Sequence, residues 1–147
     1  MIQYNGITDC LEEPINLNEV KRMSRYKDRT IIKVKTTYEG VHCYPGAPDE
    51  VAYLRDLHRH IFHVEVAMQV WSDDREIEFI MLKHKINEWF QLQTNNVGVW
   101  NMGTLSCEQV AKRLFEYLES KYDLTGRYVS ITVSEDDENG ACVERQY

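Results

Sequence analysis

The chain lacks any close pair of cysteines and any long apolar run. Its four cysteines are scattered and form no Cys-x-x-Cys pair, so they provide no zinc knuckle and are predicted to be free thiols in a reducing compartment. No stretch approaches the roughly 20 apolar residues that a membrane-spanning helix needs. Residues 1–6 have neither a basic start nor an apolar core, so no signal peptide is predicted. These absences together predict a cytoplasmic protein with no membrane partner.

Positive charge is also scarce. The chain has 17 lysines and arginines against 24 aspartates and glutamates, which gives a net charge of -7. This balance argues against a nucleic-acid-binding surface, which needs clustered basic residues. The basic patch at residues 21–27 is a local exception, and we interpret it as a solvated face. With 43% hydrophobic residues in 147, the chain is predicted to be globular and long enough for one domain with a real core.

The alternation of apolar and polar residues predicts strands over residues 30–38, 58–71, 127–135 and 141–145. Helical periodicity predicts one helix over residues 79–93 and a second from Ser106, which forms a capping box with Gln109, to about Tyr122. Residues 94–103 are expected to form a loop. Consecutive strands favour antiparallel pairing, so we predict an α+β fold: an antiparallel four-stranded sheet with two helices packed on one face. Residues 1–29 are predicted to be an N-terminal extension of this single domain, residues 30–147.

Three histidines lie where two predicted strands meet a loop. His58 and His60 are two residues apart, so strand geometry points both imidazoles to the same face, which continues through Phe62 and Val64. His42 shares the parity of the apolar positions in the preceding strand. Three imidazoles with an open position are the arrangement that catalytic zinc uses. The spacing alone leaves a second interpretation open, in which the histidine pair binds no metal.

Two further features indicate a polar binding site. Glu135 shares parity with Val133, so it is expected on the core-facing side of its strand, where a carboxylate is costly unless it is paired or binds a ligand. A ligand with an amino group and a ring N–H would pair with it through two hydrogen bonds; alternatively, Glu135 joins the acidic turn at residues 136–138. Ser106 and Glu108 lie at the start of the second helix, where free N–H groups favour anions and polar ring atoms. Simple helix capping would also explain Ser106.

The order and spacing of these residues resemble the 6-pyruvoyl tetrahydropterin synthase / 6-carboxytetrahydropterin synthase family of the tunnelling fold (T-fold), over residues 30–146. In that family one histidine ends the first strand and a His-Gly-His motif opens the second, and the three histidines hold zinc. His42 fits the first position, and residues 57–60, Leu-His-Arg-His, resemble the motif with Arg59 where glycine is usual. Residues 106–109, Ser-Cys-Glu-Gln, resemble the family's Thr-x-Glu-Asn motif. Glu135 resembles the glutamate that anchors the amino-pyrimidine edge of the pterin.

The resemblance implies a set of site residues and partners. Zn²⁺ would be held by His42, His58 and His60, and a pteridine or purine-like ligand would be contacted by Ser106, Glu108 and Glu135. The family also forms rings of subunits, which implies a homo-oligomer with the pocket at a subunit interface.

Two departures from the family concern proton transfer. The synthases place a cysteine base shortly before the His-x-His motif, but residues 52–57 contain none; Asp56 is the candidate substitute, and Glu50 a more distant one. The family's Asp-His pair in the loop after the first helix is also missing, because the corresponding loop offers asparagines, which do not exchange protons near pH 7.

The resemblance therefore predicts a zinc-dependent lyase of the pterin synthase type, acting on a dihydroneopterin triphosphate-like pteridine. Zinc would polarise the hydroxyl or carbonyl oxygens of the substrate's side chain and stabilise enediolate-like charge on it. Two alternatives stay open because of the missing groups. One is a T-fold enzyme that acts on another purine- or pterin-like nucleotide by a different proton route. The other is a non-catalytic protein that binds a pterin-like ligand.

Overall fold

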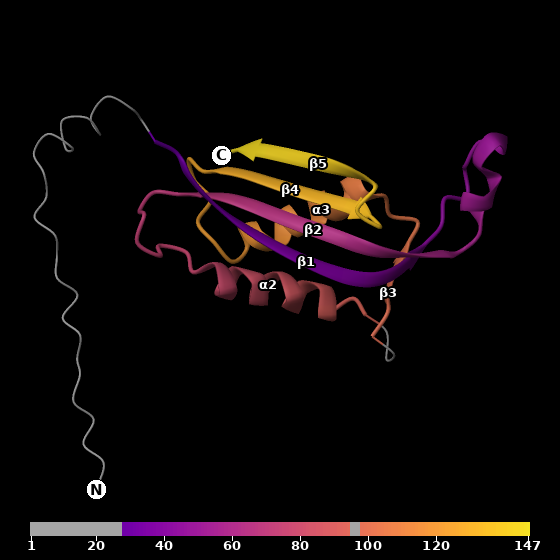
Figure 1. Ribbon diagram of the computed structural model, residues 1–147, viewed down its shortest axis with the longest axis horizontal. Coiled ribbons are helices and arrows are strands. Elements are labelled where there is room, and N and C mark those ends of the chain that lie inside the picture. The colour runs from indigo at the N-terminus through magenta and orange to yellow at the C-terminus, as the bar shows by residue number, and fades with distance from the viewer. Residues whose placement is uncertain (1–27, 95–97) are drawn as a thin grey trace, which may run out of the picture.

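The computed structural model describes residues 28–94 and 98–147 (Figure 1). The basic patch at residues 21–27, nearly all of the expected N-terminal extension and two of the loop asparagines lie outside the described residues. Among the described helices, none is both long enough and apolar enough to cross a membrane.

The described part of the chain forms a five-stranded sheet in the order β3-β1-β2-β4-β5. Its strands are β1 (Thr30–His42), β2 (His58–Val70), β3 (Trp100–Gly103), β4 (Tyr128–Glu135) and β5 (Asn139–Gln146). The pairs β1–β2, β2–β4 and β4–β5 are antiparallel. β1 and β2 are the longest strands because β-branched and aromatic residues alternate along both of them, which suits a pleated, half-buried surface.

The expected four strands were one too few, because residues 94–103 are not entirely a loop. Trp100–Gly103 forms the edge strand β3, which pairs in parallel with the end of β1 at Gly40–His42. Trp100 and Met102 alternate with polar residues and are buried, but four residues are too few for this alternation to predict a strand, and the strand pairs with the free edge of β1. Trp100 is 1% exposed, so β3 also closes the core at this end of the sheet.

Two α-helices cover one face of the sheet, with α2 (Phe79–Gln91) along β1 and α3 (Cys107–Glu119) along β4 and β5 (Figure 1). Both end two or three residues before their predicted ends. A short 3-10 helix, η1 (Asp49–Arg55), fills the connection between β1 and β2. The prediction of an α+β fold with two helices on one face is confirmed.

The apolar core lies between the helices and the even-numbered positions of β1 and β2. Along β2, Phe62, Val64, Val66 and Met68 are at most 2% exposed, and β4 adds the odd-numbered positions 129, 131 and 133. At the open end of the same face, the even-numbered series continues through His60 and His58. The parity that buries the core therefore also points these imidazoles inward.

Gly40 has a packing role at this end of β1. It is cross-strand partner to His60, and a Cβ atom built on it would lie 2.9 Å from two ring carbons of Phe62. A glycine here leaves the space that the Phe62 ring occupies beneath the histidines. β1 continues through it without a break.

One buried cation supports the opposite end of the sheet. Arg127 is 8% exposed; its guanidinium donates hydrogen bonds to the main-chain oxygens of Gln69 (2.9 Å) and Asp123 (3.0 Å) and to a carboxylate oxygen of Glu76. The Arg127 hydrogen bond, assisted by the backbone N–H of Trp71, lowers the pKa of Glu76 to about 2.

This ion pair predicts a pH-dependent stability difference. The pKa of Glu76 in the folded protein lies below its ordinary value of 4.5, so the stabilisation is fully present above about pH 4.5 and is lost as the pH falls toward 2. We expect Glu76→Gln to lower the melting temperature at pH 7, and the difference from the parent to shrink at pH 3. Thermal unfolding at both pH values measures this, with the exposed α3 residue Glu116→Gln as the control. An unchanged difference at pH 3 would contradict the assignment.

Candidate metal centre and pocket

The strand register brings three histidines together. His42 ends β1 and His58 opens β2, and the two are direct cross-strand partners. His60 lies two residues further along β2, on the same face. The ring centroid of His42 lies 4.6 Å from that of His58 and 5.3 Å from that of His60. One ligand nitrogen from each histidine lies within 4.8 Å of the others. The three imidazoles therefore converge on one point.

Each of the three rings is oriented by a hydrogen bond at Nδ1. His42 Nδ1 lies 3.3 Å from the main-chain oxygen of Leu105, and His58 Nδ1 lies 2.7 Å from that of Asp56. His60 Nδ1 lies 2.5 Å from a carboxylate oxygen of Asp136. Carbonyl and carboxylate oxygens only accept, so Nδ1 carries the proton in every ring and Nε2 presents a lone pair. Such outer partners are what metal-binding histidines usually have.

The Nε2 atoms fit a metal ion. Those of His42 and His60 are buried and have no hydrogen-bond partner, which is costly for polar atoms unless something else binds them. Burial also lowers the pKa of His42, which favours the neutral imidazole that coordinates metals. Neutral imidazole nitrogens are ordinary zinc ligands, and His42, His58 and His60 each offer one within 4.8 Å of the others. The donor set is therefore suited to Zn²⁺.

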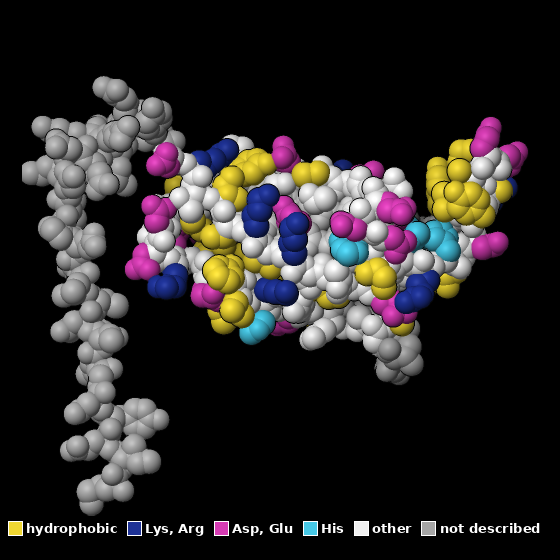
Figure 2. Space-filling model, in the orientation of Figure 1, with side chains coloured by type: hydrophobic (Ala, Val, Ile, Leu, Met, Phe, Trp, Pro, Cys, Tyr) yellow, Lys and Arg dark blue, Asp and Glu magenta, His cyan; other side chains and the backbone are white. Residues whose placement is uncertain are grey.

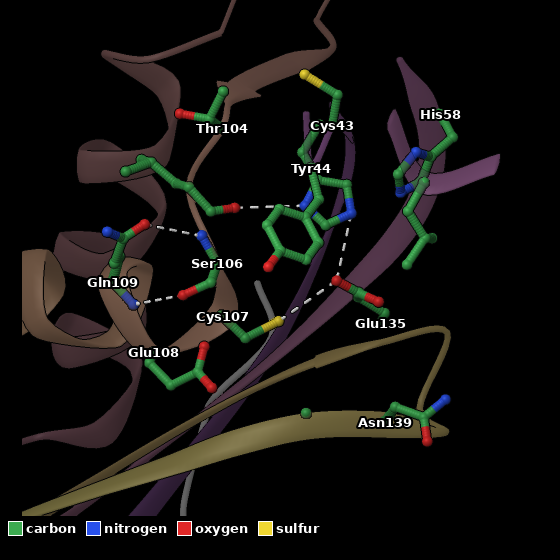
Figure 3. A pocket seen from close by; sticks show the side chains of 14 residues that line it. Cys43, Tyr44, His58, Thr104, Ser106, Cys107, Glu108, Gln109, Glu135 and Asn139 are labelled. Carbon is green, nitrogen blue, oxygen red and sulfur yellow. Dashed lines mark hydrogen bonds and ion pairs between the residues drawn. The ribbon is translucent and has the colours of Figure 1, made fainter. Parts of the chain in front are cut away.

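A cavity of about 570 Å³ opens beside the histidines. Its wall combines the ends of β1, β2 and β4 with the start of α3, as Figure 3 shows. Its polar and ionisable side chains are those of His42, Cys43, Tyr44, His58, Thr104, Ser106, Cys107, Glu108, Gln109, Glu135 and Asn139. The volume is that of a small-molecule site. Of the seven residues that the sequence predicted for zinc binding, ligand binding or catalysis, five line this cavity: His42, His58, Ser106, Glu108 and Glu135.

The start of α3 contributes Ser106 and Glu108 to the cavity wall. Ser106 Oγ accepts a hydrogen bond from the Gln109 N–H (3.4 Å), and the Gln109 side chain accepts one from the Ser106 N–H (3.1 Å). The capping box that the sequence predicted is confirmed. Glu108 is exposed, and the Ser106 hydrogen bond lowers its pKa. It therefore presents a carboxylate to the cavity at neutral pH.

Glu135 is the last residue of β4 and the cross-strand partner of Phe62. It therefore shares the face of His60 and Phe62, and its carboxylate points into the cavity (Figure 3). Its Oε1 lies 3.3 Å from His42 Nε2 and its Oε2 lies 3.8 Å from His60 Nε2. Glu135 thus connects the cavity with the histidine cluster.

The structure does not bring Asp56 into this group. Asp56 is exposed, at the C-cap of η1, and is absent from the cavity wall. Its contact with the site is the main-chain oxygen that accepts the hydrogen bond from His58. The side chain as a catalytic base stays a prediction. Glu50, the more distant candidate, is exposed within η1 and is also absent from the wall.

Cys107 lies in the cavity wall, although no role in the site was predicted for it. It is 7% exposed, and its Sγ lies 3.8 Å from Glu135 Oε1. Burial, together with the charges of Glu135 and Glu108, raises the pKa of its thiol to about 12. The thiol is therefore protonated at neutral pH and does not act as a base there. Its position in the wall could have been predicted from the sequence, because Cys107 directly follows Ser106, the N-cap of the predicted helix.

The architecture is that of the tunnelling fold: an antiparallel sheet with a parallel edge strand, two helices on one face and an open end that carries the histidines. Solved structures that it resembles include 6-pyruvoyltetrahydropterin synthases. A catalytic-residue mutant of the Plasmodium vivax enzyme aligns with a TM-score of 0.59 at 16% identity, over 82% of this chain and 100% of that one. The Plasmodium falciparum enzyme aligns with a TM-score of 0.59 at 16% identity, over 81% and 99%.

A further structure of the Plasmodium vivax enzyme aligns with a TM-score of 0.56, also at 16% identity, over 80% of this chain and 99% of that one. No family model matches the sequence, and no curated protein matches it either. The resemblance first seen in the motifs is therefore confirmed at the level of the fold.

Proposed function

We propose that the protein is a zinc-dependent enzyme of the 6-pyruvoyl/6-carboxy-tetrahydropterin synthase type that acts on a dihydroneopterin triphosphate-like pteridine. The observation that carries the proposal is the pair of buried Nε2 atoms, on His42 and His60, that lack hydrogen-bond partners beside a ligand-sized cavity. His42, His58 and His60 would hold the metal. When bound there, zinc supplies a Lewis acid that polarises substrate oxygens.

The residues of the cavity wall have distinct parts in this proposal. The carboxylate of Glu135 would accept two hydrogen bonds from the amino group and ring N–H of the pteridine, which fixes the orientation of the ring. Ser106 and Glu108, at the start of α3, would contact the same ring beside the helix N-terminus. The Asp56 main-chain oxygen holds His58 in orientation, and the Asp56 side chain is our proposed base.

The proposal includes a homo-oligomer with the pocket at a subunit boundary. η1 projects from the body of the domain (Figure 1), and none of its residues is buried. Figure 2 shows apolar side chains gathered on this projection, next to histidine; Tyr53 is 71% exposed and Leu57 61%. A neighbouring subunit would cover this surface. A monomeric mass by light scattering would contradict this part of the proposal.

Removing zinc tests the function directly. We expect the purified protein to contain about one zinc ion per chain by elemental analysis, and a chelator such as dipicolinate to remove both the metal and the turnover of dihydroneopterin triphosphate. Added Zn²⁺ should restore the turnover. Mass spectrometry of the products, with the chelated protein as the control, measures it. Full turnover by metal-free protein would contradict the proposal.

A second function, capture of a pterin-like ligand without turnover, is favoured by one observation. The buried thiol of the cavity, Cys107, has a pKa of about 12, so it does not provide a base near neutral pH. Retained pteridine binding with no conversion of any pteridine or purine nucleotide by zinc-loaded protein would select this function. Conversion of a different nucleotide would select the other T-fold enzyme.

A further inference from the structure

The Glu135 carboxylate faces the histidine cluster from the end of β4. Its Oε1 lies 3.3 Å from His42 Nε2, and its Oε2 lies 3.8 Å from His60 Nε2. In Figure 3 the carboxylate lies between the histidine side of the cavity and Cys107. Both oxygens therefore face the proposed metal donors, and Oε1 is the closer of the two.

The proton positions make this approach unusual. His42 uses its single N–H, at Nδ1, to donate to Leu105, and His60 uses its own to donate to Asp136. The Nε2 atoms then carry lone pairs, and a carboxylate oxygen carries only lone pairs. Neither contact is a hydrogen bond, because both Nε2 atoms lack a partner. Acceptors that face one another at these distances repel unless a cation lies between them.

The shorter of the two distances agrees with a shared cation. In a tetrahedral zinc site with bonds of about 2.0–2.1 Å, two donor atoms lie about 3.3–3.4 Å apart. The 3.3 Å between Glu135 Oε1 and His42 Nε2 matches that edge. Carboxylate oxygens are ordinary zinc ligands at about 2.0–2.2 Å.

The turn that follows Glu135 holds the carboxylate in place. Asp136 and Asp137 have φ values of 52° and 61°, and the Glu138 N–H donates to the Glu135 carbonyl at 2.9 Å, which forms a tight hairpin turn. Asp136 also exchanges hydrogen bonds with the main chain of Ile61, as donor and acceptor, each at 2.8 Å. The hairpin therefore positions both an outer partner of His60 and the Glu135 carboxylate.

We infer that Glu135 is a fourth donor to the metal in this chain, so that the ligand-free site is closed by three imidazoles and one carboxylate. This inference rests on the proposed three-histidine centre and deepens it. An amino-pyrimidine edge that pairs with both oxygens of Glu135 would compete with the metal for this carboxylate. A ligand that pairs with Glu135 would therefore free the coordination position that Glu135 fills. The metal would then offer an open position only when the cavity holds a ligand.

Metal affinity measured without any substrate tests the inference. Glu135→Gln keeps the side-chain shape but removes the anionic donor. We expect its Zn²⁺ affinity, measured by competition with a chromophoric chelator, to fall by about a hundredfold, the upper end of the loss from removing an outer-shell partner. The matched control is Glu108→Gln, because Glu108 lines the same cavity and has no contact with the histidines among the interactions of the described residues. Its affinity should stay within about twofold of the parent. Circular dichroism verifies folding of both.

A second measurement reports on the open position. In Co²⁺-loaded parent protein, azide should change the visible spectrum only at high concentration, because Glu135 fills the fourth position. In Co²⁺-loaded Glu135→Gln it should bind at least about tenfold more tightly. Equal zinc affinities, or equal azide binding in the two proteins, would overturn the inference while leaving the three-histidine centre intact. Absence of metal binding by the parent protein would overturn both.

Discussion

Replacing His58 by alanine is expected to lower zinc affinity by at least a hundredfold and to abolish pteridine turnover, while the domain stays folded. His58 is the cross-strand partner of His42, and its Nδ1 is already satisfied by Asp56, so its Nε2 is free for the metal. It is half-buried at the end of β2, outside the apolar core, so its loss opens no cavity there. Removing an outer-shell partner costs 10–100-fold in metal affinity, and loss of a ligand itself should cost at least as much.

The matched control for this prediction is His63→Ala. His63 lies on the same strand but at an odd-numbered position, so its side chain points to the opposite face of the sheet. The His63→Ala protein should therefore bind zinc and convert the pteridine as the parent does. Competition titration, elemental analysis and product mass spectrometry on both variants measure the difference. Turnover by folded His58→Ala at the parent rate would end the zinc-enzyme proposal.

Replacing Phe62 by alanine is expected to lower the free energy of unfolding by about 3–5 kcal/mol, the usual cost of removing a buried aromatic ring. Phe62 is fully buried, and its ring lies 5.8 Å from that of Trp100 and 5.4 Å from that of His42, measured between centroids. Gly40, which lies against this ring, has no side chain. It therefore cannot fill the space that the ring leaves. The cavity would therefore persist, which places the effect in the upper part of that range.

Urea unfolding of the metal-free protein measures this prediction. The control is Phe79→Ala, the same substitution at a residue that is 54% exposed; it should cost less than about 1 kcal/mol. Because Phe62 supports the imidazoles from below, its removal should also weaken zinc binding. Leu82→Ala, on the buried face of α2, should destabilise the fold without that second effect. A Phe62→Ala protein as stable as Phe79→Ala would contradict the packing described here.

Local pattern was enough to predict much of the fold. The alternation in β1, β2 and β4 and the periodicity of α2 and α3 each report which face of an element is buried, and burial is what the sequence pattern encodes most directly. The Ser106–Gln109 capping box is a contact within one turn, so it too could be read locally. β3 could not, because two apolar positions in four residues are too few to distinguish a strand from a loop, and its pairing depends on the edge of β1.

In the site, too, local features could be predicted from the sequence and contacts between separate elements could not. Sequence parity by itself determined that His58 and His60 share one face with the core, and motif resemblance assigned His42, Ser106, Glu108 and Glu135 to the same site. Only the tertiary structure decided that His42 stands directly across from His58, that Nδ1 of each ring is already occupied, and that Glu135 turns its oxygens toward two unpartnered nitrogens. It also left Asp56 outside the cavity and placed Cys107 within it. The physical reason is that side-chain direction follows from local backbone geometry, whereas register and the approach of separate strands follow from how the whole sheet and its helices pack.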